Sequence, residues 1–156
     1  MIVPLVASIL AATAPCTAND VRSFNGMLQG ATGTMLGAVS LRNVSHRSCA
    51  LGGRPRVQIV NLAGRIFPTR ERTFALGTTG ARPRATLLPN QIALLHLDWS
   101  NWCGSWSGSA GAFQRLYIRV TLTNGSRLRL PLRTGRPRCD QPNGPSFLAV
   151  SAFGDA

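Results

Sequence analysis

Lysine is absent from this sequence, and acidic residues and histidines are few. All 17 basic residues are arginine, only five residues are acidic and two are histidine, so the formal net charge is +12. The use of arginine alone indicates a high-GC coding bias at least as much as a need for arginine chemistry. The charge favours anionic partners such as nucleic acid, membrane head groups or wall polymers, without choosing among them. None of the four cysteines forms a C-x-x-C pair, which argues against zinc-ribbon and thioredoxin-type sites.

Long helical patterns are also missing, and short strands take their place. The chain is 44% hydrophobic and 14% charged, which excludes a disordered tail, and its 16 glycines and 10 prolines are typical of strands joined by tight turns. Every second residue is apolar over residues 92–99, 116–122 and 127–133, which gives each stretch one continuous apolar face. These patterns predict an all-β sandwich of about seven to nine strands, with residues 15–156 as a single domain.

Residues 116–133 predict a β-hairpin. A two-residue turn at Asn124-Gly125 would place Val120 opposite the charged Arg129, which one shared face does not allow. A three-residue loop over 124–126 instead places Val120 opposite Leu130. We therefore predict the three-residue loop, with its glycine in the left-handed region.

Four cysteines, Cys16, Cys49, Cys103 and Cys139, are expected to form two disulfides in an oxidising compartment. Three pairings are possible. Pairing neighbours in sequence order gives Cys16–Cys49 and Cys103–Cys139. Each bridge would close a loop of about 35 residues and contribute about 4 kcal/mol in the chain-entropy model.

The first 14 residues resemble an export signal. Residues 2–14 are apolar or small and end in Ala12-Thr13-Ala14, which is similar to a signal-peptidase site, but no basic residue precedes them. We interpret residues 1–14 as a signal-like or truncated export segment; a plain first β-strand is the alternative. The run is too short to span a bilayer comfortably, so no transmembrane span is expected.

Several ordered segments carry a resemblance to a known family. They are Pro15–Ala18, Asn43–Pro55, Asn61–Gly64, Leu87–Ala93, the cysteines Cys103 and Cys139, and Leu148–Phe153. With them the chain resembles the domain of unknown function 4232 family, whose members are secreted proteins and lipoproteins of high-GC Gram-positive bacteria. The resemblance implies an extracytoplasmic, disulfide-linked, immunoglobulin-like antiparallel sandwich and carries over no catalytic residues. Two positions depart from the family pattern: Asn90 stands where glycine is usual, and Arg54 where an aromatic residue is frequent.

Catalysis is not expected. His96 and Asp98 share one strand face, but neighbours two apart on a strand do not face each other, and no motif places a nucleophile beside them. The few acidic residues also argue against a glycosidase pair. We predict a non-enzyme with no cofactor and no metal site.

Two surfaces are candidates for binding. The outer face of the hairpin carries the basic and aromatic residues Arg115, Tyr117, Arg119, Arg127, Arg129 and Arg133, which could hold phosphates or stack on bases. A solvated strand face is the simpler interpretation. Trp99, Trp102 and Trp106 lie at the start of or within a Gly/Ser-rich loop and could contact sugars or a protein partner. The simpler interpretation is that Trp99 fills the core and one of the others covers the disulfide.

The expected function is therefore a non-catalytic binding or accessory module of the cell envelope that engages an anionic polymer or a protein. The alternative is a basic nucleic-acid-binding protein inside the cell, which would keep its four cysteines reduced.

Overall fold

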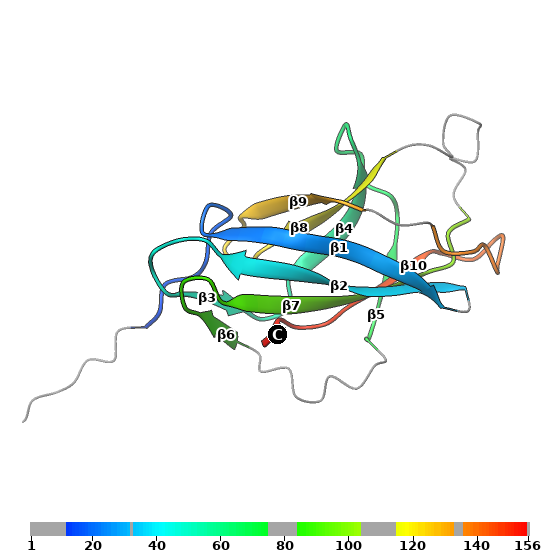
Figure 1. The fold of residues 1–156 in the computed structure, drawn as a ribbon. Coiled ribbons are helices and arrows are strands. Elements are labelled where there is room, and N and C mark those ends of the chain that lie inside the picture. Colours follow the sequence, from blue (N-terminus) through cyan, green and yellow to red (C-terminus); the bar gives the residue numbers. More distant parts are fainter. Residues whose placement is uncertain (1–11, 32, 75–83, 104–114, 133–135, 156) are drawn as a thin grey trace, which may run out of the picture.

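The computed structural model describes residues 12–31, 33–74, 84–103, 115–132 and 136–155, which form strands and no helix (Figure 1). The strands are β1 (Val21–Ala31), β2 (Thr34–Asn43), β3 (Cys49–Gly52), β4 (Arg56–Asn61), β5 (Arg70–Arg72), β6 (Arg84–Leu87), β7 (Ile92–Ser100), β8 (Leu116–Thr121), β9 (Arg127–Pro131), β10 (Phe147–Val150) and β11 (Gly154–Asp155). These parts of the chain contain no helix long and apolar enough to cross a membrane.

Two main sheets form the layers of a sandwich. The larger sheet has the order β1-β2-β7-β10-β5, and β11 also pairs with β7. The sheet β4-β8-β9 forms the second layer behind it, and the pair β3-β6 lies at one end (Figure 1). The predicted all-β sandwich is confirmed.

The structure differs from the prediction in two details. It has eleven strands in its described part, because β5 and β11 are only three and two residues long and leave no alternating pattern in the sequence. The named strands pair antiparallel except β5 and β10, which are parallel, and the isolated bridge between Pro15 and Ala50 is parallel as well. The parallel pair arises because the chain leaves the β4 sheet after a short bridge and enters the larger sheet beside β10.

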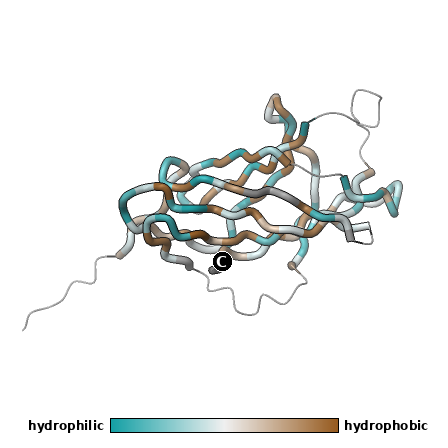
Figure 2. The backbone as a smooth tube through the Cα atoms, viewed as in Figure 1, coloured by the Kyte–Doolittle hydropathy of each residue, from teal (hydrophilic) through white to brown (hydrophobic). Residues whose placement is uncertain are grey.

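The core lies between the two sheets and follows from the period-2 pattern of their strands (Figure 2). In β7, every second residue from Ala93 to Trp99 is buried, and β8 contributes Leu116, Ile118 and Val120 in the same way. Trp99 is fully buried, and its indole N–H donates a 3.0 Å hydrogen bond to the Ser146 hydroxyl. The large aromatic ring therefore fills the centre without leaving its polar atom unpaired.

The β8–β9 hairpin has the predicted kind of loop in a different register. Gly125 has a φ of 84°, and its N–H donates to the Leu122 carbonyl at 2.9 Å. The loop is Thr123-Asn124-Gly125, one residue earlier than expected, so Val120 lies opposite Leu128 rather than Leu130. The predicted pairing was wrong by two residues, and because two is the period of a strand, the same side chains still face the core.

Both expected disulfides are present. Cys16–Cys49 and Cys103–Cys139 each have Cα atoms 4.8 Å apart, and the structure contains no free cysteine. Next to the first bridge, the Ala50 N–H donates to the Ala14 carbonyl and the Cys16 N–H to the Ala50 carbonyl, each at 2.9 Å. The chain therefore already pairs with β3 at residue 14. Residues 1–11 of the expected export segment lie outside the described residues.

Candidate anion-binding face of the three-stranded sheet

The outer surface of the β4-β8-β9 sheet gathers arginines from all three strands. Strand register places Arg119 opposite Arg129 on one side and opposite Gln58 on the other. In the next row, Thr121 lies between Arg56 and Arg127. Because opposed residues share a face, and the intervening residues of β8 are buried, these side chains point outward. We call Arg56, Arg119, Arg127 and Arg129 the arginine face.

Two of these guanidinium groups are held in place by uncharged partners. Arg119 donates two hydrogen bonds to the Gln58 side-chain oxygen, at 3.2 and 2.6 Å. Arg129 lies 4.5 Å from the centre of the Tyr117 ring and donates to the Leu62 carbonyl at 3.0 Å. These contacts orient the cations and leave their charge uncompensated.

No carboxylate in the described part of the molecule forms an ion pair with these four arginines. The ion pairs there are Arg47–Asp20, Arg54–Glu71 and Arg138–Asp140. None of the three involves the arginine face. That face is therefore a surface of positive charge with hydrogen-bond donors directed to solvent.

The remaining predicted binding residues are distributed differently. Arg115 is exposed just before β8, whereas Trp106 and Arg133 lie outside the described residues. Trp102 is half-buried, with its ring centre 4.8 Å from that of Phe67 and 5.2 Å from that of Trp99. Trp102 thus extends the aromatic core at this end of the sandwich.

His96 and Asp98 lie on the outer face of β7, as expected from the alternation. The His96 ring is 5.9 Å from the ring of Phe74. Burial raises the pKa of Asp98 above its ordinary value, and the positive charge of Arg72 offsets part of that rise. Within the described residues, no hydrogen bond joins the two side chains, and no group of three or more His, Cys, Asp or Glu could hold a metal ion.

A family model described as Domain of unknown function (DUF4232) matches residues 16–153, which is nearly the whole chain. The chain belongs to the DUF4232 family. No curated protein and no solved structure matches it.

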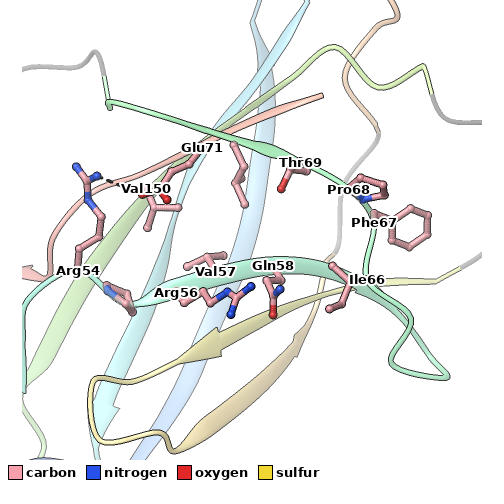
Figure 3. Close-up of a pocket in the computed structure, with 12 residues that line it drawn as sticks. Arg54, Arg56, Val57, Gln58, Ile66, Phe67, Pro68, Thr69, Glu71 and Val150 are labelled. Carbon is pink, nitrogen blue, oxygen red and sulfur yellow. Dashed lines mark hydrogen bonds and ion pairs between the residues drawn. The ribbon is translucent and has the colours of Figure 1, made fainter. Parts of the chain in front are cut away.

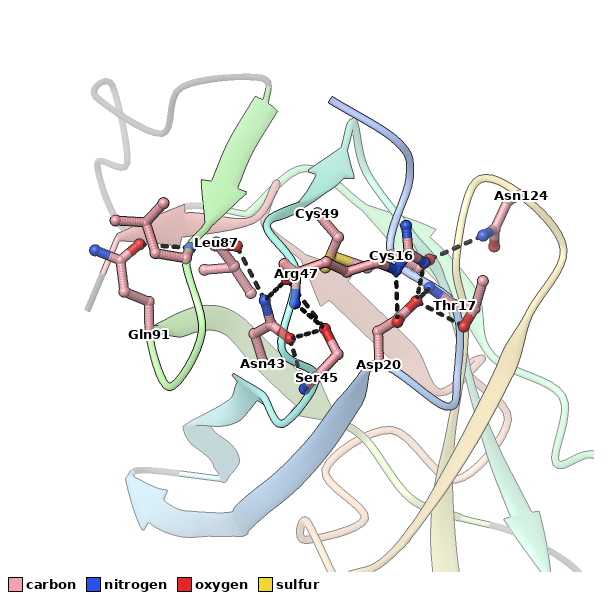
Figure 4. The surroundings of a disulfide bond; sticks show 11 residues. Cys16, Thr17, Asp20, Asn43, Ser45, Arg47, Cys49, Leu87, Gln91 and Asn124 are labelled. Atoms are coloured by element: carbon pink, nitrogen blue, oxygen red, sulfur yellow. Dashed lines mark hydrogen bonds and ion pairs between the residues drawn. A yellow bond between two sulfur atoms is a disulfide. The ribbon is translucent and has the colours of Figure 1, made fainter. Parts of the chain in front are cut away.

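Three of the segments that carry the family resemblance, Pro15–Ala18, Asn43–Pro55 and Leu87–Ala93, meet near the Cys16–Cys49 bridge, where the structure shows a buried polar cluster (Figure 4). Asn43 is fully buried and its side chain makes four hydrogen bonds. It donates to the carbonyls of Arg47 and Leu87 and accepts from the backbone N–H and the hydroxyl of Ser45. One amide therefore joins the end of β2, the loop before β3 and the end of β6.

Asp20 forms the second half of this cluster (Figure 4). Its carboxylate accepts hydrogen bonds from the Thr17 N–H and hydroxyl, both at 2.7 Å, and from the Arg47 guanidinium at 3.2 and 2.7 Å. Burial alone would raise the pKa of Asp20, but the hydrogen bonds from Thr17 and the contact with Arg47 lower it below its ordinary value. Sequence reasoning missed Asp20 and Arg47 as partners because 27 residues separate them.

Asn90 explains one departure of this DUF4232 domain from its family. It has a φ of 68°, in the left-handed region that glycine adopts without strain. Asparagine is among the few other residues that tolerate this conformation.

Proposed function

We propose that this domain is a non-catalytic, extracytoplasmic module that binds linear anionic polymers on its arginine face. The observation that carries the proposal is the set of four outward arginines without a carboxylate partner in the described residues. Arginine offers a planar fork of donors that matches phosphate and carboxylate oxygens.

The spacing of the face suits a chain of closely spaced anions. Neighbouring strands lie about 4.8 Å apart, and same-face residues along a strand about 7 Å apart. Arg119 and Arg129 are direct cross-strand neighbours, and Arg127 lies one row further. One extended polyanion could contact several guanidinium groups together, and each contact would release counterions.

Two of the arginines are already oriented in the free protein, which reduces the entropic cost of binding. Gln58 orients Arg119, and Tyr117 with the Leu62 carbonyl orients Arg129, before any ligand arrives. Side chains that are already ordered lose less rotamer freedom when they bind.

The two disulfides support an extracytoplasmic location. Cys16 and Cys49 are almost fully buried, and such bridges persist in oxidising compartments. Anions available there include polyol-phosphate wall polymers and acidic glycans. The alternative is a nucleic-acid-binding protein inside the cell. One face of the Tyr117 ring already carries the Arg129 guanidinium, which leaves less of the ring for base stacking.

Titration with a polyglycerol-phosphate polymer at several salt concentrations tests the proposal. The double variant R127Q/R129Q should lower the affinity about tenfold and reduce the salt dependence by about two ionic contacts. The control R22Q/R138Q removes the same charge from exposed positions outside the face. Equal losses in both variants would mean that only the overall charge attracts the polymer. Tighter binding to single-stranded DNA than to the polymer would favour the nucleic-acid alternative.

A further inference from the structure

Strand β4 lies at the edge of its sheet and is paired on its outer side along only half its length. On that side the Phe67 N–H donates to the Ile59 carbonyl at 2.9 Å, and the Asn61 N–H to the Arg65 carbonyl at 3.0 Å. The chain then passes Pro68 and crosses to β5 in the other sheet (Figure 3). The first half of β4 is left without a neighbour on this side.

The free backbone groups follow from the antiparallel ladder. Alternate residues of an edge strand direct both their N–H and C=O groups to the same side. Ile59 and Asn61 bond away from β8, so Val57 must do the same. In the described part of the chain, the N–H and C=O of Val57 and the N–H of Ile59 make no hydrogen bond. This is a short template for an added strand.

A groove of about 550 Å³ runs along this free edge, between β4 and β5 (Figure 3). Its apolar lining comes from Val57, Phe67, Leu148 and Val150, which are otherwise core residues of the sandwich. The groove is large enough for a few side chains of an extended peptide. A strand bound there would bury alternate side chains against this lining.

Charge around the groove selects the partner. Arg54 and Arg56 line it. Arg70 and Arg72 flank Glu71 on β5 and point to the opposite face of that strand, where Arg72 lies 3.5 Å from the centre of the Phe147 ring. The acidic residue of the lining, Glu71, is 3.3 Å from Arg54, and the two side chains are 70% and 46% exposed. A surface pair of this kind contributes little, so an incoming carboxylate could replace Glu71. A second copy of this chain would instead bring the same arginines together, which disfavours self-pairing.

We propose that this groove binds an acidic, extended peptide segment of a partner protein, which adds as a strand to the free half of β4. The backbone of Val57 and Ile59 would supply the hydrogen bonds, the apolar lining would take alternate aliphatic side chains, and Arg54 and Arg56 would pair with acidic ones. The site shares Arg56 with the arginine face, but its other residues are distinct, and peptide binding does not require polymer binding.

Amide NMR of the isotope-labelled protein provides the first test. In the free protein, the Val57 and Ile59 amide protons should exchange with solvent faster than that of Gln58, which faces β8. The probe is the synthetic peptide Glu-Val-Glu-Val-Thr-Val-Glu, and the control is a charge-reversed peptide in which Lys replaces each Glu. The acidic peptide should slow exchange at Val57 and Ile59 and shift their resonances in a saturable way. Binding of both peptides alike, or shifts confined to the arginine face, would overturn the proposal.

Charge variants give the second test. R54E should weaken binding of the acidic peptide about tenfold, whereas E71Q, which frees Arg54, should strengthen it several-fold. R127Q/R129Q should leave peptide affinity unchanged, which separates this site from the arginine face. All four positions are exposed or outside the core, so folding should be preserved. Absence of peptide binding up to millimolar concentration, or a dimer that itself protects Val57 and Ile59, would refute the proposal.

Discussion

Replacing Asn43 with alanine tests whether the buried polar cluster holds the strand ends together. The side chain is fully buried and makes four hydrogen bonds. Its loss would remove the amide donor to the buried Leu87 carbonyl and the acceptor of the Ser45 N–H, and each such hydrogen bond contributes about 1 kcal/mol. The Arg47 carbonyl would still accept a 3.0 Å hydrogen bond from the Ser45 hydroxyl, so losing the Asn43 donor costs less free energy at this carbonyl. We expect N43A to lower the free energy of unfolding by about 3 kcal/mol.

Urea unfolding of the oxidised protein, followed by the fluorescence of the buried Trp99, measures this change. The matched control is N124A. Asn124 is exposed and its side chain also bonds backbone, donating to the Cys16 carbonyl at 2.8 Å and accepting from the Ser126 N–H at 3.1 Å. Its loss should cost about 1 kcal/mol. If N43A and N124A agree to within about 0.5 kcal/mol, the argument from buried, unsatisfied groups is refuted.

Three further predictions concern Asp20, Asn90 and the two disulfides. Because the pKa of Asp20 is lowered in the folded state, its stabilisation is present above the unfolded pKa of about 3.9 and is lost as pH falls through the lowered value. The free energy of unfolding of D20N should therefore be about 2 kcal/mol lower than that of wild type at pH 7, and this difference should disappear below about pH 4. An unchanged difference at pH 2 would contradict the argument. At the left-handed position, N90G should keep or raise the melting temperature and N90A should lower stability by about 1 kcal/mol; equal melting temperatures for the two would contradict the φ argument. Secreted protein should show an intact mass four hydrogens below that of the reduced chain, and C16A/C49A should lose about 4 kcal/mol; four free thiols would refute the proposed extracytoplasmic location.

Sequence periodicity predicted those strands that bury one face. β7 and β8 alternate throughout their length, so their inward residues could be assigned before the structure was known. The even number of cysteines predicted two disulfides, and pairing neighbours in sequence order predicted the two pairs that the structure shows. The hairpin register was missed by two residues because a shift by one strand period leaves the same faces buried, and the sequence pattern alone does not distinguish the two.

Long-range geometry was beyond the sequence. The parallel pairing of β5 and the half-paired edge of β4 depend on where the chain changes sheets, and Pro68 alone does not specify that crossing. The arginine face was predicted from β8 and β9, but the contribution of Arg56 required knowing that β4 pairs with β8. Asp20 and Arg47 meet only because β1 and β2 are neighbours.

The placement of the two disulfides also determines how the domain would respond to mechanical tension. Cys16–Cys49 encloses β1 and β2, and Cys103–Cys139 encloses β8 and β9, so these four strands lie in loops that a pulling force applied at the chain ends cannot straighten. Only the stretch between Cys49 and Cys103 and the two ends can extend, and that stretch supplies roughly 190 Å of contour length at about 3.5 Å per residue. Reduction would release two further loops, with sequence separations of 33 and 36 residues. An oxidised domain tethered between two surfaces would therefore extend only by this short stretch, and the strand pairs β1–β2 and β8–β9 would lengthen only after the disulfides are reduced.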